Sequence, residues 1–259
     1  MEILNRIISR KKEEVAEAKK NVSIEKLKAL PDYSKPSGSF KNALINSSIG
    51  IIAEFKRKSP SKGWLNENAD VLNITKGYDA FGAVAVSVLT DHFFFGGSLD
   101  DLQVVSQQVS CPVLRKDFMV DSYQLHEAKA YGADVILLIA AALSPEKVKE
   151  LSEEAYEIGL EVLLEIHNES ELENICNSTP IVGVNNRDLK SFSVDLQTSI
   201  DLSSLIPADK IKISESGIAD ASAIHRLRSF GFSGFLIGET FMKEADPVNA
   251  FKLFKENLL

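Results

Sequence analysis

The chain has 259 residues, of which 44% are hydrophobic and 25% are charged, as is typical of a single globular domain. Its formal net charge of −8 at pH 7 argues against a nucleic-acid or membrane-surface binder, and it contains neither an apolar run of membrane-spanning length nor a signal-peptide core. Two widely separated cysteines, Cys111 and Cys176, and four scattered histidines show no metal-binding spacing, so we expect a reduced, cytoplasmic protein without a metal.

The first 48 residues are predicted to form helices and no strand. Residues 2–20 carry apolar side chains at helical spacing with Lys and Glu between them, which predicts an amphipathic helix. These apolar residues are Ile3, Leu4, Ile7, Ile8 and Val15. Shorter helices are expected over residues 22–30, where Ser23 is a suitable N-cap, and over residues 40–45. We expect this prefix to pack over one end of the domain.

From Gly50 onward, short apolar runs alternate with longer amphipathic segments, the pattern of βα units around a parallel sheet. Strands are predicted at residues 51–55, 83–88, 113–115, 135–139, 161–165, 181–184, 212–214 and 235–237. Helices are predicted near residues 70–81, 99–109, 121–131, 144–158, 169–177, 195–205, 220–230 and 246–257. Four glycines at the ends of helical segments suit left-handed C-caps: Gly82, Gly132, Gly159 and Gly231.

Eight such units favour a closed (β/α)8 barrel, the TIM barrel, over an open doubly wound sheet. An open dinucleotide-binding sheet would carry a glycine-rich turn after its first strand, whereas this chain has Lys-Arg-Lys-Ser-Pro-Ser at residues 56–61. We therefore predict one barrel domain over residues 1–259, with residues 1–48 as a helical extension of the same domain. Reactive groups in such barrels lie at the C-terminal ends of the strands.

The first strand ends in an acid and a base. Glu54 and Lys56 are two residues apart, so they point to the same, inward face of the strand. Ionised groups are costly to bury unless they are paired or used in chemistry. The two residues are either a catalytic pair or an ordinary ion pair before a solvated basic loop, and this segment alone does not distinguish the two.

Further polar and aromatic groups follow later strands. Lys116, taken alone, suits a solvent-exposed lysine just past a strand. Glu165 lies between apolar residues, where burial would raise its pKa and a nearby lysine would lower it, a balance suited to proton transfer near neutrality. Asn185 either caps the sixth strand or binds a ligand. The loop Phe93–Phe95 either belongs to the core or covers an aromatic substrate.

The last two strands end in glycine-containing turns, Ser214–Ile218 and Ile237–Glu239. Barrels often bind phosphate through backbone N–H groups in the loops after these two strands, although both segments also suit routine turns. Their occurrence together at the expected units favours a phosphate site. The candidate phosphate-binding residues are Ser216, Gly217, Gly238 and Glu239.

Five ordered segments carry a resemblance to a known family: Ala53–Ser61, Leu114–Phe118, Leu164–His167, Gly183–Leu189 and Ser214–Ile218. With the helical prefix, they resemble indole-3-glycerol-phosphate synthase, a carboxy-lyase of tryptophan biosynthesis, over essentially the whole chain. Some members carry Gly-Ser where this chain has Gly238-Glu239. Because a carboxylate beside a phosphate would be repulsive, we expect the Glu239 side chain to point away and only its backbone N–H to contribute.

The resemblance implies cofactor-free ring closure of 1-(2-carboxyphenylamino)-1-deoxyribulose 5-phosphate with loss of CO2 and water. It implies Lys116 as general acid for ring closure, while Lys56, Glu165 and Glu54 share the later dehydration. Glu54 and Asn185 would also hold substrate hydroxyls and the lysines. The implied substrate-binding residues are Ser59, Phe95, Phe118, Leu137, Arg187 and Glu215. The partner is then a phosphorylated small molecule, and the oligomeric state stays open, a monomer being one alternative.

Two other functions remain as alternatives. A related phosphate-binding barrel that isomerises a phosphoribosyl amine would use a cysteine or an aspartate pair at its strand ends, where this chain has Glu54 and Lys56. A sensor that only holds a phosphorylated metabolite would need neither a general acid nor a base, whereas this chain has candidates for both.

Overall fold

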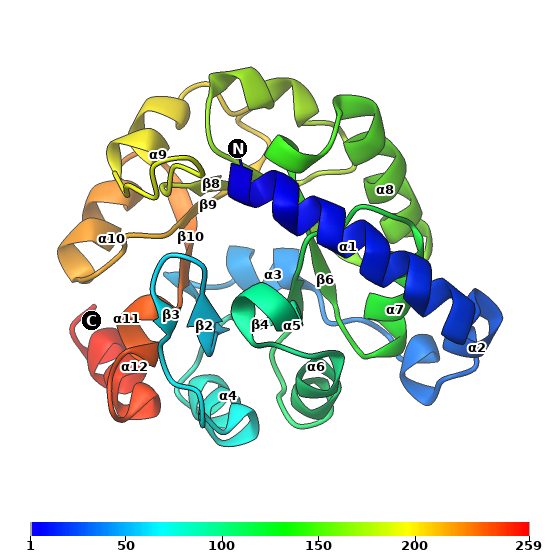
Figure 1. Cartoon of the computed structure of the whole chain (residues 1–259). Helices are drawn as coiled ribbons and strands as arrows, with labels where there is room; N and C mark the ends of the chain where they lie inside the picture. Colours follow the sequence, from blue (N-terminus) through cyan, green and yellow to red (C-terminus); the bar gives the residue numbers. More distant parts are fainter. Residues whose placement is uncertain (1, 259) are drawn as a thin grey trace.

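The computed structural model describes residues 2–258 and shows a closed barrel (Figure 1). Its eight strands are parallel and follow the order β1-β10-β9-β8-β7-β6-β5-β4. The strands are β1 (Gly50–Phe55), β4 (Ala85–Leu89), β5 (Val113–Lys116), β6 (Val135–Ile139), β7 (Glu161–Ile166), β8 (Ile181–Asn185), β9 (Ile211–Glu215) and β10 (Phe232–Ile237). The predicted (β/α)8 barrel is confirmed, and every predicted strand overlaps an observed one.

Helices alternate with the strands around the outside of the barrel (Figure 1). They are α4 (Val71–Ala80), α6 (Leu99–Ser106), α7 (Tyr123–Ala130), α8 (Pro145–Glu157), α9 (Gln197–Leu202), α10 (Ala221–Arg228), α11 (Glu239–Met242) and α12 (Pro247–Glu256), with the 3₁₀ turn η2 (Ala140–Ala142) after β6. None of the helices within residues 2–258 is both long and apolar enough to span a membrane.

One predicted helix has a different form. The segment expected as a helix over residues 169–177 is a short 3₁₀ helix, η3 (Glu169–Asn174). Asn168 caps its start by accepting a hydrogen bond from the Ser170 N–H at 3.0 Å. The Glu171 carboxylate turns back to the His167 N–H at 2.8 Å, which tightens the turn. These side-chain hydrogen bonds to the backbone compete with the α-helical pattern, and the segment forms a short 3₁₀ helix.

The core has two layers, because successive strand residues point to opposite faces. One layer lies between the strands and the outer helices and includes Ile51, Val86 and Val182. The other fills the barrel interior and includes Ile52, Leu114 and Leu163, together with residues of the other strands. The next inward position on each of these three strands is a charged residue, so the interior becomes polar at its C-terminal end. The inward residues at that end are Glu54, Lys116 and Glu165.

The helices of the prefix pack against both ends of the barrel. Helix α1 (Glu2–Asn21) crosses the opening at the C-terminal ends of the strands (Figure 1). After α2 (Ile24–Lys28) and η1 (Pro31–Ser34), helix α3 (Phe40–Ile45) closes the opposite end, where its fully buried Phe40 and Leu44 complete the interior layer. The prediction that the prefix covers one end is therefore wrong. An isolated amphipathic segment does not show which surface its apolar face will cover.

Two local structures in the loops were not predicted. The loop after β1 contains a small antiparallel hairpin of β2 (Lys58–Ser59) and β3 (Gly63–Trp64). The segment expected as the loop Phe93–Phe95 belongs to a one-turn helix, α5 (His92–Phe95), which Asp91 caps and Gly96 ends at φ 65°. Both segments are too short to show a hydrophobic period, so they read as loops in the sequence.

Candidate active site

A cavity of about 510 Å³ opens at the C-terminal ends of the barrel strands. Every candidate residue predicted from the sequence contributes to its wall. The candidate catalytic group comprises Glu54, Lys56, Lys116, Glu165 and Asn185; the substrate group comprises Ser59, Phe95, Phe118, Leu137, Arg187 and Glu215; the phosphate group comprises Ser216, Gly217, Gly238 and Glu239. Residues from all eight βα units and from α1 therefore meet in one enclosed space.

Lys116 lies among the charged side chains that line the cavity. It ends β5, and the pleat turns its side chain inward above Leu114. Its Nζ lies 2.9 Å from Glu165 Oε2 and 3.5 Å from Glu215 Oε2. Burial would lower its pKa, but the carboxylates of Glu165, Glu215 and Glu54 raise it above the ordinary value. Lys116 is thus a buried, charged ammonium with carboxylates around it, and not a solvent-exposed lysine.

Glu165 is held between two cations. Lys116 donates to its Oε2, while His167 Nε2 lies 3.2 Å from its Oε1. Burial would raise the pKa of Glu165, but these two neighbours hold it well below the ordinary value. Burial would lower the pKa of His167, which its ion pairs with Glu165 and Glu171 instead raise to about 10. The expected balance near neutrality is therefore not observed at Glu165, which is an anion in this geometry.

The carboxyl group with a near-neutral pKa is that of Glu215, at the end of β9. Burial raises its pKa to about 8, Lys116 opposes this shift, and Glu165 and Glu54 add to it. Its Oε1 is buried and has no hydrogen-bond partner among the described residues. The sequence placed Glu215 among the substrate-binding residues but gave no sign of this titration. The shift arises from burial and from the approach of carboxylates on other strands, neither of which the sequence shows.

Glu54 and Lys56 form the ion pair that their spacing predicts, with Lys56 Nζ 2.6 Å from Glu54 Oε1. Asn185 both lines the cavity and caps a turn, since its Oδ1 accepts a hydrogen bond from the Arg187 N–H at 3.0 Å. The two interpretations of Asn185 are therefore compatible. Its amide nitrogen is not required by the turn.

The proposed phosphate loops have the backbone shape that close approach needs. Ser216 and Gly217 both have positive φ angles, 68° and 77°. A buried neighbour that the sequence did not single out, Asn186, fixes this turn by donating to the backbone oxygens of Glu215 and Ser216 at 2.9 and 3.0 Å. Gly238 lies so close to the Glu54 side chain that a Cβ at this position would be 2.5 Å from Glu54 Oε1.

The structure corrects the expectation for Glu239. Its side chain lines the cavity, with Oε1 2.5 Å from Lys62 Nζ and Oε2 3.4 Å from an Arg187 nitrogen. Burial would raise the pKa of Glu239, whereas Lys62 and Arg187 lower it. The carboxylate does not turn away from the cavity, because two cations on neighbouring loops attract it. Lys62 lies in the basic loop after β1, and its partner could not be read from the sequence.

Apolar groups also line the cavity. Of the three phenylalanines in Phe93–Phe95, only Phe95 lines it, 6.0 Å from the Phe118 ring between centroids, while Phe94 is buried and Phe93 is exposed. Leu137 of β6 and three residues of α1 line the cavity as well. The α1 residues are Ile3, Leu4 and Ile7. The cavity therefore combines apolar and aromatic side chains with charged ones, which suits a ligand with an aromatic part and an ionic part.

No metal site accompanies these groups: within residues 2–258, no cluster of three or more His, Cys, Asp or Glu side chains is arranged to hold a metal ion.

Solved structures with a similar fold include two from Pyrococcus furiosus. The tryptophan synthase α-subunit of Pyrococcus furiosus superimposes with a TM-score of 0.59 at 17% identity, over 81% of this chain and 97% of that one. Thiamine phosphate pyrophosphorylase from P. furiosus gives a TM-score of 0.60 at 13% identity, over 85% of this chain and 98% of that one. At these identities, the likeness establishes the fold alone.

Sequence relatives are much more similar. The indole-3-glycerol phosphate synthase of Bacteroides thetaiotaomicron is 49% identical over 253 residues, 98% of this chain and 97% of the relative. Those of Acinetobacter baumannii and Burkholderia vietnamiensis are each 41% identical, over 96% and 95% of this chain and 94% and 96% of theirs. The model of the family described as indole-3-glycerol phosphate synthase matches residues 4–254. The chain belongs to the indole-3-glycerol phosphate synthase family.

Proposed function

We propose that this cavity converts 1-(2-carboxyphenylamino)-1-deoxyribulose 5-phosphate into indole-3-glycerol phosphate, CO2 and water, as the chain's family membership indicates. The observation that carries the proposal is the largely buried Lys116 ammonium, fixed by Glu165 in a cavity that apolar and aromatic side chains also line. The aromatic ring of the substrate fits against these apolar side chains, and the carbonyl that must be protonated then faces the ammonium. The conversion is redox-neutral, so its atom balance requires no cofactor.

Lys116 is the proposed general acid for ring closure. An aromatic carbon of the substrate attacks the ketone carbon, and the new carbon–carbon bond forms as the ketone oxygen takes a proton from Lys116 Nζ. The bond to the carboxylate then breaks, CO2 leaves, and the released electron pair restores the aromatic ring. Positioned general acids contribute roughly 10²–10⁴-fold to a rate. A lysine kept charged chiefly by the Glu165 carboxylate is available as a donor throughout the neutral range.

The dehydration that follows needs an acid for the departing hydroxyl and a base for the remaining proton. We propose Lys56 as the acid, held by Glu54 at 2.6 Å, and Glu165 as the base. Glu165 starts as an anion because of Lys116 and His167. Once Lys116 has given its proton away, that attraction is lost and the pKa of Glu165 rises, so the first step prepares the second. Asn185 and Glu54 are placed to hold substrate hydroxyls.

The phosphate of the substrate is proposed to bind the backbone of Ser216, Gly217 and Gly238, with Arg187 as counter-charge. The positive φ angles in the β9 turn expose backbone N–H groups, which is how such turns bind anions. Glu239 then contributes its backbone N–H and, through its carboxylate, holds Lys62 and Arg187 at the cavity wall. All these groups belong to one chain, which supports a monomer as the working unit.

The prefix and the barrel are proposed to form a single domain, because α3 closes one end of the interior and α1 lines the cavity at the other. Both cysteines are free thiols, which supports a reducing compartment such as the cytoplasm.

Gly217→Ala is expected to raise KM at least about tenfold, equivalent to ~1.4 kcal/mol of binding free energy. The new Cβ would lie 2.4 Å from Val194 Cγ1 at a φ of 77°, so the turn must shift. Affinity for inorganic phosphate, measured by competition, should weaken with it. Gly159→Ala is the matched control, with a φ of 78° at a helix end outside the cavity. Equal phosphate binding by both variants would place the phosphate elsewhere.

The value of kcat/KM is expected to fall above about pH 8, because Glu215 then ionises and repels a substrate that carries a carboxylate and a phosphate. Glu215→Gln imitates the neutral carboxyl and should remove this fall.

Stability should depend on pH for the same reason. The pKa of Glu215 in the folded protein exceeds its value of about 4.3 in the unfolded chain, so between these two pH values the folded state holds a proton that the unfolded state has lost. The stabilisation from Glu215 is therefore lost as pH rises toward 8. Melting temperature should fall more steeply over this range in wild type than in Glu215→Gln, and identical profiles would contradict the assignment.

The function itself is tested by turnover of the ribulose phosphate substrate with the full chain, followed by the fluorescence of the indole product. Stoichiometric release of CO2 is expected. Binding of the substrate without product would favour the sensor, and conversion of a phosphoribosyl amine in its place would favour the isomerase.

A further inference from the structure

The buried face of α1 contains a lysine. Leu4, Ile7 and Val15 of this face are buried, and Lys11 occupies the position between Ile7 and Val15 on the same stripe with 4% of its surface exposed. An unpaired ammonium at such a position would be strongly unfavourable. The sequence itself indicates that Lys11 lies on the buried face, because it is four residues from an apolar residue on either side.

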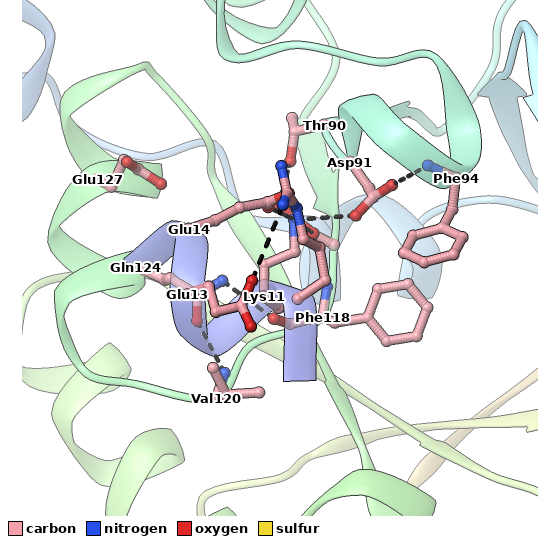
Figure 2. Close-up of polar contacts among 12 residues, drawn as sticks. Lys11, Glu13, Glu14, Thr90, Asp91, Phe94, Phe118, Val120, Gln124 and Glu127 are labelled. Carbon is pink, nitrogen blue, oxygen red and sulfur yellow. Dashed lines mark hydrogen bonds and ion pairs between the residues drawn. The ribbon is translucent and has the colours of Figure 1, made fainter. Parts of the chain in front are cut away.

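The Lys11 ammonium contacts two loops of the barrel. Its Nζ lies 3.0 Å from Asp91 Oδ2 and 2.8 Å from Glu14 Oε2, one turn further along α1 (Figure 2). It also lies 3.0 Å from Asp117 Oδ1. Burial would lower the pKa of Lys11, but Asp117, Asp91 and Glu14 raise it above the ordinary value. The side chains of both aspartates are almost completely buried. Lys11 therefore acts as a permanent cation between α1 and two strand ends.

Each aspartate orients a segment that lines the cavity. Asp117 follows Lys116 directly, and its Oδ1 also accepts a hydrogen bond from the Phe118 N–H at 2.8 Å. Asp91 caps α5 by accepting a hydrogen bond from the Phe94 N–H at 2.7 Å, which orients the helix that carries Phe95 (Figure 2).

The two aspartates differ in their other partners. Arg115 and Thr90 bind the second oxygen of Asp117 at 3.1 and 2.7 Å. The second oxygen of Asp91 faces the Lys11 ammonium at 3.0 Å and has no other cation within residues 2–258. Loss of Lys11 would therefore leave Asp91 buried without a counter-charge, while Asp117 would keep Arg115.

We propose that Lys11 is a positioning residue for the ring-closure reaction. It holds three parts of the protein in one fixed arrangement around the aromatic part of the substrate: the apolar residues of α1 that line the cavity, the segment Lys116–Phe118, and helix α5. The inference rests on the proposed function, since it assigns to that reaction a residue outside the cavity wall. The physical basis of this inference is that the buried Lys11 ammonium contacts residues of α1, the segment Lys116–Phe118 and the cap of α5 at the same time. These three parts must close on the aromatic ring of the substrate.

The test compares Lys11→Met, which keeps the length and removes the charge, with the full-length wild type. Misplacement of catalytic groups by about 1 Å can cost on the order of 10²-fold, and we expect a loss of that size in kcat/KM, with both a raised KM and a lowered kcat. Affinity for inorganic phosphate should not change, because the phosphate loops follow β9 and β10. Lys11→Arg should restore most of the activity, because a guanidinium can still bond to both aspartates.

Lys129→Met is the matched structural control. Lys129 on α7 is also buried and also binds the prefix, through Ser37 Oγ at 2.6 Å and the Lys35 carbonyl at 3.2 Å, but it does not line or adjoin the cavity. It should lower the melting temperature without changing kcat/KM. If the two variants lose activity in the same proportion to their loss of stability, Lys11 is merely structural and the proposal is wrong.

Two further measurements keep the inference testable in every case. Should Lys11→Met fail to fold, Asp91→Asn retains the oxygen that caps α5 and removes the charge that faces Lys11; an unchanged KM would overturn the proposal. Binding of the substrate is followed separately through Trp64, the single tryptophan, by rapid mixing on a time scale shorter than one turnover. A wild type that binds but does not convert the substrate refutes the proposed function, whereas equal affinity of wild type and Lys11→Met refutes the role of Lys11.

Discussion

Lys116→Met is expected to reduce kcat by roughly 10²–10⁴-fold, the contribution of a general acid, and to change KM little. The methionine side chain fills the same space but carries no proton for the ketone oxygen. Stability should suffer less than for a typical buried ion pair. Glu165 keeps His167 at 3.2 Å, and Glu215, with a pKa of about 8, can remain neutral. Steady-state kinetics and a melting curve on the same sample check both expectations.

Lys210→Met is the control for Lys116. Lys210 also has a side chain that is largely buried, but it binds the Cys176 carbonyl at 2.8 Å before β9, at the opposite end of the barrel. It should lower the melting temperature and leave kcat unchanged. A Lys116→Met protein with near-normal kcat and only a weakened affinity would make Lys116 a binding residue, and the acid would have to be sought among the other cavity groups.

Glu165→Gln is expected to lower kcat by at least about 10²-fold, the lower end for a lost general base. Removing one partner of a buried ion pair typically costs about 3–5 kcal/mol. We expect a loss of unfolding free energy below about 3 kcal/mol here. The reason is Glu215, whose pKa is raised partly by the charge on Glu165. Without that charge, Glu215 ionises more readily and pairs with Lys116, 3.5 Å away.

Two results on the same Glu165→Gln sample decide between the roles of this residue. A large fall in kcat with a small fall in melting temperature supports the catalytic base. Early melting with normal turnover would make Glu165 a structural counter-charge and refute its catalytic assignment. The pH profile adds a third readout, because the descending limb assigned to Glu215 should move to lower pH in this variant.

The sequence alone was sufficient to predict the fold and the charged residues at the ends of the barrel strands, but not the contribution of α1 to the cavity wall. Periods of 2 and 3.6 residues identify the strands and helices, and a count of eight units closes a barrel. Because alternate strand residues face inward, the positions of Glu54, Lys116 and Glu165 at the strand ends were sufficient to bring them together. The ordered motifs around these residues identified the family.

Tertiary structure alone decided which charges are neighbours and hence which group titrates. Lys116 and His167 hold the pKa of Glu165 low, so Glu165 is an anion, whereas burial and the charges of Glu165 and Glu54 raise the pKa of Glu215 to about 8. The same holds for Lys11 with Asp91 and Asp117, and for Glu239 with Lys62. Coulomb energies vary with distances of a few ångströms between residues far apart in the chain, and sequence periodicity carries no information about those distances.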